Sequence, residues 1–290
     1  GVVEREVAHE SVGSGRQCGS GVPLRVQKVC HIHFIGWIDR FLSTSLRRSV
    51  CPTYDPAVAT QPEPTRITLI RHGESNVTVQ RIIGGHRTCS GLSDLGRRQS
   101  AQLAQRLGES QELGADVLIS SDFARAVETA EIIAPAIGIA DIERWPDFGE
   151  HDPGPDIDGM TFDEYVVRFG TPDWSDDPEV EIFPGGETTA RFHTRVRTAV
   201  GRLIDTHAGA HVAIACHGGV IDAVFRNALD LAVSGGFALH TFNTSLTEFV
   251  SPAEPDATWQ LIRYNDTAHL AGLPAATERS DVTRDAASTT

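Results

Sequence analysis

The sequence has little cysteine, and what it has shows no pairing pattern. The cysteines are odd in number and form no C-x-x-C pair. Such usage argues against a disulfide framework and favours reduced thiols in a cytoplasmic protein. The five cysteines are Cys18, Cys30, Cys51, Cys89 and Cys216.

Positive charge is also scarce. There are 25 Lys and Arg residues against 39 Asp and Glu residues, which gives a formal net charge of −14. An acidic surface argues against nucleic acid or an anionic membrane as the main partner. Any anionic substrate must therefore be held by a local cluster of arginines.

Long apolar runs are missing as well. The apolar segment 29–42 is too short to span a bilayer and is interrupted by polar residues such as His31 and Asp39. Its histidines also argue against a signal peptide. Cys30 and His33 have no second pair at ligand spacing, so we expect no metal there.

Three regions are expected along the chain. With 40% hydrophobic residues the chain can bury a full core. Residues 1–64 are rich in Gly, Ser and Arg and aperiodic, which predicts a poorly ordered N-terminal extension. Residues 65–272 carry the periodic apolar pattern of a single domain, and residues 273–290 are polar, which predicts a disordered tail.

The segment 67–75 organises the rest of the chain. Its β-branched apolar run predicts a buried parallel strand, with Arg71, His72 and Gly73 at the carboxyl end. Open α/β sheets bind ligands at that end. An arginine fork, a nucleophilic imidazole and a glycine that lets the backbone come close suit a phosphate. Alone, the tripeptide fits a solvated turn equally well.

Further strands and helices alternate after this segment, which predicts a largely parallel sheet covered on both faces. Ser93 is expected to cap the first long helix, and the motif at 184–187 to open another. Two late runs are expected to form an edge hairpin. Strands are predicted at 116–120, 139–145, 211–215, 245–250 and 259–264, and helices at 93–107, 123–137, 184–203 and 220–229.

Residues that follow successive strands gather along one rim of such a sheet. Arg71, His72, Arg125, Glu150 and His217 are therefore expected to converge. Two arginines can neutralise a phosphoryl group, His72 can attack phosphorus in line, and His217, if protonated, can stabilise the equatorial oxygens. Glu150 can protonate the leaving oxygen and then accept a proton from water, a role that requires a raised pKa. No metal-ligand spacing is visible, so the arginines take the place of a metal.

These motifs resemble the histidine phosphatase superfamily, the phosphoglycerate mutase-like family, in its bacterial phosphatase branch. The matching segments, in the family's order, are 69–75, 91–96, 120–130, Glu150 with Gly154 and Gly159, 184–187 and 216–219. The resemblance covers about residues 66–270. It implies a three-layer α/β/α sandwich, phosphohistidine chemistry at His72, Glu150 as proton donor, and phosphate binding by Arg71, Arg125 and His217.

Two positions depart from the family pattern, and further substrate contacts are expected in loops. Thr78 stands where the family often has asparagine, and Cys216 where a small non-thiol residue is usual; Cys216 is expected to be a buried packing residue. We expect Thr78, Gly84, Arg87 and Gly218 to contact substrate, although loop residues such as Arg87 could equally be incidental.

Three functions stay open from the sequence. Water acting on phosphorylated His72 gives a phosphatase, whereas a retained second hydroxyl gives a phosphoglycerate mutase-type isomerase. A mutase needs extra cations, yet the segment 151–156 is acidic, so a phosphatase is favoured. A non-catalytic phosphate-binding module is the third reading. The expected substrate is a small phosphorylated metabolite, and a homodimer remains among the open oligomeric states.

Overall fold

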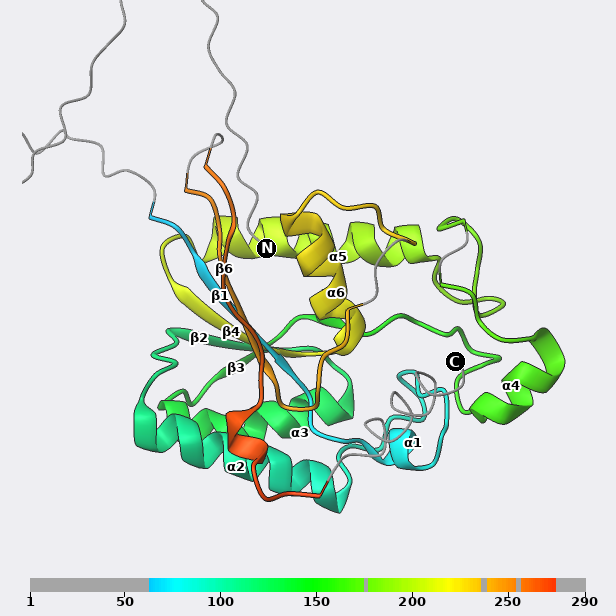
Figure 1. Ribbon diagram of the computed structural model, residues 1–290, viewed down its shortest axis with the longest axis horizontal. Helices are drawn as coiled ribbons and strands as arrows, with labels where there is room; N and C mark the ends of the chain where they lie inside the picture. Colours follow the sequence, from blue (N-terminus) through cyan, green and yellow to red (C-terminus); the bar gives the residue numbers. More distant parts are fainter. Residues whose placement is uncertain (1–62, 175–176, 236–238, 254–256, 275–290) are drawn as a thin grey trace, which may run out of the picture. The chain divides into compact units, whose positions relative to one another are not determined.

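The structure is a computed structural model that describes residues 63–174, 177–235, 239–253 and 257–274. A six-stranded sheet in the order β3-β2-β4-β1-β5-β6 runs through it (Figure 1). Strands β1 to β4 are mutually parallel, whereas β5 is antiparallel to β1 and to β6. The strands are Arg66–Arg71 (β1), Val117–Ser120 (β2), Ile142–Arg144 (β3), His211–Cys216 (β4), Leu246–Val250 (β5) and Gln260–Asp266 (β6).

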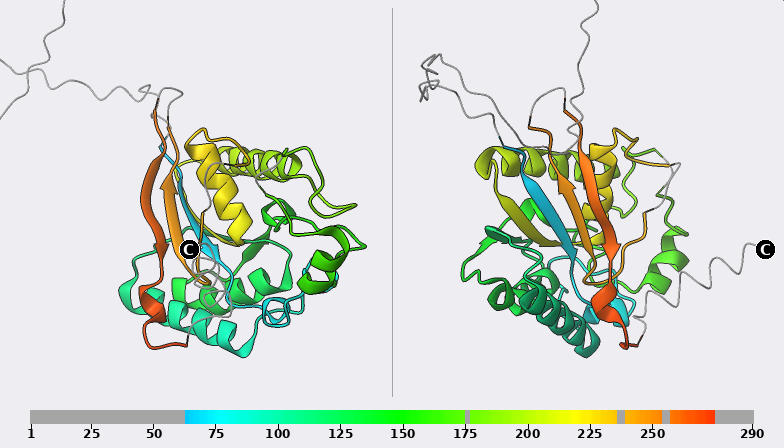
Figure 2. Two further views of the ribbon diagram at one scale, coloured as in Figure 1. Left: turned by 45° about the vertical axis from the view of Figure 1, so that its right-hand side comes forward. Right: turned by 60° about the vertical axis from the view of Figure 1, so that its left-hand side comes forward.

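Helices cover both faces of this sheet (Figures 1 and 2). Helices α5 and α6 lie on one face and α2 and α3 on the other. The fold is therefore a three-layer α/β/α sandwich with a mostly parallel sheet, as the resemblance implied. The helices are Asn76–Val79 (α1), Asp94–Ser110 (α2), Ala124–Ile133 (α3), Phe162–Phe169 (α4), Thr189–Thr206 (α5) and Gly218–Ala228 (α6), with short 3-10 turns at Ala134–Ile137, Pro146–Phe148 and Ala268–Leu270.

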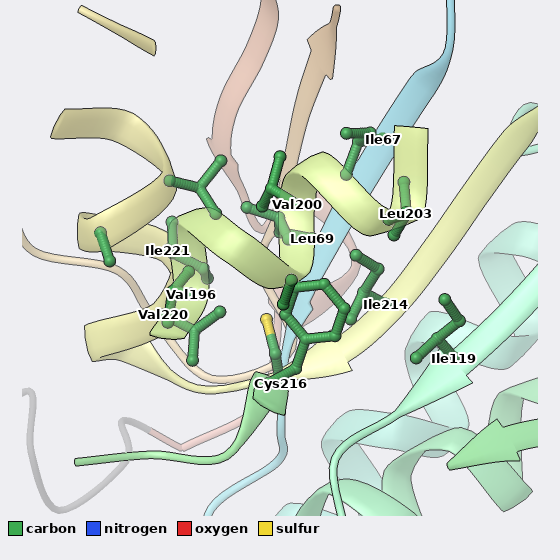
Figure 3. Close-up of a cluster of buried hydrophobic side chains, with 14 of the residues drawn as sticks. Ile67, Leu69, Ile119, Val196, Val200, Leu203, Ile214, Cys216, Val220 and Ile221 are labelled. Atoms are coloured by element: carbon green, nitrogen blue, oxygen red, sulfur yellow. The ribbon is translucent and has the colours of Figure 1, made fainter. Parts of the chain in front are cut away.

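The alternation of side chains along the strands builds two cores. Leu69 packs in the cluster with α5 and α6, whereas the next residue, Ile70, packs in the cluster with α2 and α3. Figure 3 shows the first cluster, in which the Cys216 side chain lies among aliphatic side chains of the strands, α5 and α6. The thiol is fully buried and burial raises its pKa, so the expected packing role of Cys216 is confirmed.

Most predicted elements are present, with shifted ends. Ser93 caps α2, its side chain accepting from the amide of Gly96 at 3.0 Å, but the helix runs on to Ser110. The motif 184–187 does not open α5: Thr188 is the cap, because its hydroxyl accepts from the amide of Arg191. Strands β5 and β6 form the predicted hairpin at one edge.

Helix α4 was not predicted, although Thr161 and Glu164 form a capping box at its start. The predicted N-terminal extension lies outside the described residues up to residue 62, as does the predicted tail from residue 275. Among the helices of the described part, none has the length and apolar character needed to cross a membrane.

Candidate active site

The register of the sheet brings two histidines to one level of its rim. Arg71 at the end of β1 pairs with Cys216 at the end of the adjacent strand β4. His72 and His217 therefore leave neighbouring strands side by side, with ring centroids 5.1 Å apart. Both side chains are buried. The convergence expected for parallel strand ends is present here.

The hydrogen bonds of His72 define its tautomer. Nδ1 lies 2.6 Å from the carbonyl oxygen of Gly73, which can only accept, so Nδ1 carries the proton. Nε2 accepts from Nε of Arg125 at 3.1 Å. Burial, reinforced by the charges of Arg125 and Arg71, holds the pKa of His72 well below 6.5. Nε2 is thus the unprotonated ring nitrogen, and its lone pair points to the cation of Arg125.

Arg125 connects the two histidines. Its Nε also donates to Nδ1 of His217 at 3.3 Å, and its Nη1 donates to the carbonyl of Gly84 at 3.4 Å and to Sγ of Cys89 at 3.3 Å. The guanidinium lies 4.5 Å from the centroid of the Phe123 ring. This buried arginine, in the first turn of α3, can exchange these neutral acceptors for phosphate oxygens.

His217 is oriented by Ser121. Because its Nδ1 accepts from Arg125, its Nε2 carries the proton and donates to the hydroxyl of Ser121 at 2.7 Å. Burial and the charge of Arg125 lower the pKa of His217 well below 6.5, so the ring is neutral in this structure. The protonated His217 of the sequence prediction requires an anion in the site.

Glu150 lies at the N-terminus of α6. Its Oε2 accepts from the amide of Gly219 at 3.2 Å, and its Oε1 accepts from the amide of His151 at 3.0 Å. A Cβ on Gly219 would come within 2.3 Å of Glu150 Oε1. Glycine at this position therefore lets the carboxylate reach the cavity beside the helix end.

The segment 241–244 anchors the turn after β1. The guanidinium of Arg71 donates to the carbonyl of Thr241, and Nδ2 of Asn243 donates to the carbonyl of His72 at 3.1 Å. The amide of Thr244 donates to the carbonyl of Arg71 at 2.8 Å. Three hydrogen bonds from one distant segment thus hold the backbone of this turn and the side chain of Arg71.

Gly73 serves a purpose that the sequence did not indicate. A Cβ there would lie 2.6 Å from the carbonyl oxygen of Gly96 in α2, so the close backbone approach is to a helix and not to a ligand. The amide of Gly73 is taken by the hydroxyl of Thr129 at 3.1 Å. The glycine lets α2 pack against the turn after β1.

One cavity of about 840 Å³ unites these groups. Of the predicted site residues, His217 does not line the cavity itself, but it accepts a hydrogen bond from Arg125, which does. Arg87 stands apart, because its guanidinium and amide are taken by Asp158, whose carboxylate also accepts from the amide of Gly85 at 2.9 Å. The predicted residues that line the cavity are Arg71, His72, Thr78, Gly84, Arg125, Glu150 and Gly218.

The cavity also has lining residues that sequence reasoning did not assign. They lie beyond Glu150, on the side of α4, α5 and α6. Their sequence neighbours gave a partial signal, since His151 follows the acid and Phe183 precedes the 184–187 motif. Among them are His151, Trp174, Phe183, Phe192, His193, Asp222 and Arg226.

The site holds the parts of a phosphoryl-transfer centre built on histidine and arginine. No group of three or more His, Cys, Asp or Glu side chains that could hold a metal occurs among residues 63–174, 177–235, 239–253 and 257–274. Fold and site together thus define a class of α/β enzymes that act on phosphate esters through an arginine-flanked imidazole.

The comparisons agree with this class. The model of the histidine phosphatase superfamily, branch 1, matches residues 67–267. The chain belongs to the histidine phosphatase superfamily. It is 33% identical over 169 residues to phosphoglycerate mutase-like protein 4 of Arabidopsis thaliana, a match covering 56% of this chain and 70% of that protein.

Two further matches carry phosphatase names. The metal-independent phosphoserine phosphatase of Arabidopsis thaliana is 27% identical over 221 residues, which cover 74% of this chain and 87% of that protein. The solved native structure of mycobacterial glucosyl-3-phosphoglycerate phosphatase superposes with a TM-score of 0.57 and 27% identity, covering 70% of this chain and 99% of that one.

Proposed function

We propose that this protein is a metal-independent phosphomonoester hydrolase that works through a phosphohistidine at His72. One observation carries the proposal. The proton of His72 is fixed on Nδ1 by the carbonyl of Gly73, which leaves the lone pair of Nε2 in a cavity beside Arg125. That arrangement is the one an imidazole nucleophile requires.

The reaction proceeds in two steps. Arg71, Arg125 and His217 bind the phosphoryl oxygens while Nε2 of His72 attacks phosphorus in line. The phosphorus–oxygen ester bond breaks, and a protonated Glu150 gives its proton to the leaving alcohol oxygen. Water then attacks phosphorus and gives a proton to Glu150, while the bond between Nε2 and phosphorus breaks. Inorganic phosphate leaves, and His72 returns to its neutral form.

The phosphoglycerate mutase-type alternative fits the cavity less well. A mutase retains a second anionic group and needs a cation for it. Among the described lining residues, the arginine beyond Arg71 and Arg125 is Arg226, and its Nε donates to the Asp222 carboxylate at 2.7 Å. Because one relative is named phosphoglycerate mutase-like protein 4, the test includes the mutase reaction. It also includes the third possibility, a non-catalytic phosphate-binding module.

The test is phosphate release from a panel of phosphomonoesters that includes 3-phosphoglycerate and phosphoserine, in the presence of chelator, for the full chain and for His72→Ala. The expected result is chelator-resistant hydrolysis that the variant lacks. Conversion of 3-phosphoglycerate to its 2-isomer without phosphate release would establish the mutase. Absence of both reactions, with phosphate binding that survives in His72→Ala, would establish the binding module.

The setting of the enzyme completes the proposal. The acidic net charge opposes a nucleic acid as substrate, whereas Arg71 and Arg125 in the cavity support a small phosphorylated metabolite. The unpaired thiols of Cys89 and Cys216 support a cytoplasmic location. The homodimer stays a prediction, which light scattering of the full chain decides.

A further inference from the structure

The part of the cavity beyond Glu150 is lined by aromatic rings around one histidine. The ring of His151 lies 5.2 Å from that of Trp174, 5.8 Å from Phe183 and 5.7 Å from Phe192, centroid to centroid. We call His151 with these three rings the outer compartment. It opens into the same cavity as His72 and Glu150. A leaving group attached to a phosphate at His72 would extend into it.

His151 is a polar side chain without a polar partner. It is 9% exposed, and neither Nδ1 nor Nε2 has a hydrogen-bond partner among the described residues. Burial lowers its pKa, so the ring is neutral at neutral pH, with one N–H to donate and one lone pair to accept. A buried polar atom left unbonded destabilises the protein, and a ligand group can satisfy it.

Charge in this part of the cavity disfavours an anionic leaving group. The guanidinium of Arg226 is engaged by Asp222, and its Nη1 donates to the carbonyl of Ala232 at 2.7 Å. The carboxylates of Asp222 and Glu150 both line the cavity. A second carboxylate or phosphate on the substrate would face them without a compensating cation from the described lining.

Size and surface favour a ring. A cavity of about 840 Å³ has room for a molecule much larger than phosphate. Besides the three rings, its wall carries the apolar residues Val77, Ile82, Ile83, Pro153, Val233 and Leu239. Flat apolar groups pack well between aromatic side chains.

We infer that the leaving group of the substrate is an uncharged alcohol that carries a planar ring, which packs on Phe183, Phe192 and Trp174, with a hydroxyl or amide on that ring hydrogen-bonded to His151. This inference rests on the proposed phosphatase function and narrows its substrate class. His151 and the three rings select the substrate, whereas Arg71, His72 and Arg125 bind the phosphate common to all substrates.

The test compares substrates whose leaving alcohols are similar in acidity, so that chemistry does not mask binding. The set contains ethyl phosphate, 2-phenylethyl phosphate, its three ring-hydroxylated isomers, 3-phosphoglycerate and glucose 6-phosphate. We expect kcat/KM for 2-phenylethyl phosphate to exceed that for ethyl phosphate by at least about tenfold, because the ring is buried. At least one hydroxylated isomer should gain a further several-fold through His151.

Two variants assign the effects to residues. Trp174→Ala should raise KM for 2-phenylethyl phosphate more than for ethyl phosphate. Its matched control is Phe169→Ala, since Phe169 on α4 is 49% exposed against 47% for Trp174 and does not line the cavity. His151→Phe should remove the advantage of the hydroxylated isomer over 2-phenylethyl phosphate.

The outcomes separate this inference from the proposed function. If ethyl phosphate is hydrolysed by the intact protein and not by His72→Ala, the phosphatase reading stands whatever the ring does. Equal or higher kcat/KM for 3-phosphoglycerate or glucose 6-phosphate than for the ring-bearing substrates would overturn the inference alone. A hydroxyl advantage that persists in His151→Phe would overturn the role of His151. Absence of all hydrolysis would overturn the proposed function and the inference with it.

Discussion

At the scale of single residues, the position of His72 depends on groups that contact the backbone of its turn. Asn243 is proposed as a positioning residue, because its Nδ2 donates to the carbonyl of His72 at 3.1 Å. Asn243→Ala removes the hydrogen bond to the carbonyl of His72 and leaves every phosphate-binding side chain in place. We expect kcat to fall about 10- to 100-fold, since a misplaced nucleophile is slow, while the inhibition constant of inorganic phosphate changes little.

Steady-state kinetics with phosphate inhibition measures both quantities. Asn227→Ala, in helix α6, is a control that should leave both unchanged. A rise in the inhibition constant of phosphate as large as the fall in kcat would show that Asn243 shapes the phosphate site as a whole.

Gly219 leaves room for the carboxylate of Glu150, because it has no side chain. In Gly219→Ala the new methyl group would stand 2.3 Å from Glu150 Oε1 and 3.2 Å from the Phe192 ring, so the carboxylate must move. We expect kcat for alkyl phosphates to fall about 100-fold, because the leaving alcohol loses its proton donor. Phenyl-type esters, whose leaving groups need less protonation, should lose much less.

The comparison of alkyl and aryl phosphates in stopped assays checks this result. Gly201→Ala is the matched control, since a Cβ on Gly201 in α5 meets nothing within 4 Å. Equal losses for both ester types in Gly219→Ala would mean that the residue does not act through Glu150.

At the scale of elements, the loop between α1 and α2 is held from a distant segment. Asp158 accepts from the amides of Gly85 at 2.9 Å and Arg87 at 2.8 Å, and from the hydroxyl of Thr88. Burial acts to raise the pKa of Asp158, but these hydrogen bonds outweigh it and the pKa is lowered. The loop carries Gly84, whose carbonyl accepts from Arg125.

Asp158→Ala should therefore loosen one wall of the cavity. We expect KM to rise about tenfold with a smaller change in kcat, and the free energy of unfolding to fall by about 1–3 kcal/mol, because two backbone amides lose a buried partner. Kinetics and urea unfolding measure the two effects. Asp156→Ala, an exposed neighbour, is the control. An unchanged KM would contradict a role in substrate binding for the hydrogen bonds between Asp158 and residues 85–88.

The elements also show what a sequence can predict here. The ends of β1 and β4, with Arg71, His72 and His217, were predictable because parallel strand ends meet at one rim whatever the details of packing. The hydrogen bonds of Asn243 to the turn after β1 and of Asp158 to residues 85–88 could not be predicted, since both join segments far apart in the chain. Helix α4 was missed because the acidic segment around it was interpreted as solvated, although Thr161 begins a capping box.

At the scale of the whole molecule, buried histidines set the response of stability to pH. Six of them have pKa values below the ordinary 6.5, chiefly because burial disfavours the charged form; for His193 and His269 the value is about 4. Below about pH 6.5 the unfolded chain binds more protons than the folded one, so acid favours unfolding. The six are His72, His151, His193, His211, His217 and His269.

We therefore expect the free energy of unfolding to be fully present above about pH 6.5 and to fall as the pH is lowered to about 5, by about 1.4 kcal/mol per pH unit for each proton taken up. Urea unfolding at a series of pH values measures the slope. In His193→Gln this slope should be smaller by the contribution of about one proton, roughly 1.4 kcal/mol per pH unit. A stability that is flat or rises across this range on acidification would contradict the neutral state of these rings.

The central claim is that the phosphoryl group is transferred to Nε2 of His72 before water releases it. The most direct measurement is rapid quenching of Glu150→Gln with a reactive aryl phosphate, because this variant keeps the nucleophile and slows hydrolysis of the intermediate. We expect one acid-labile, alkali-stable phosphoryl group per chain, located on the peptide that contains His72. The doubly substituted protein, which also carries His72→Ala, should lack it. Phosphate release in a burst with no phosphorylated His72, or a phosphoryl group on any other residue, would contradict it.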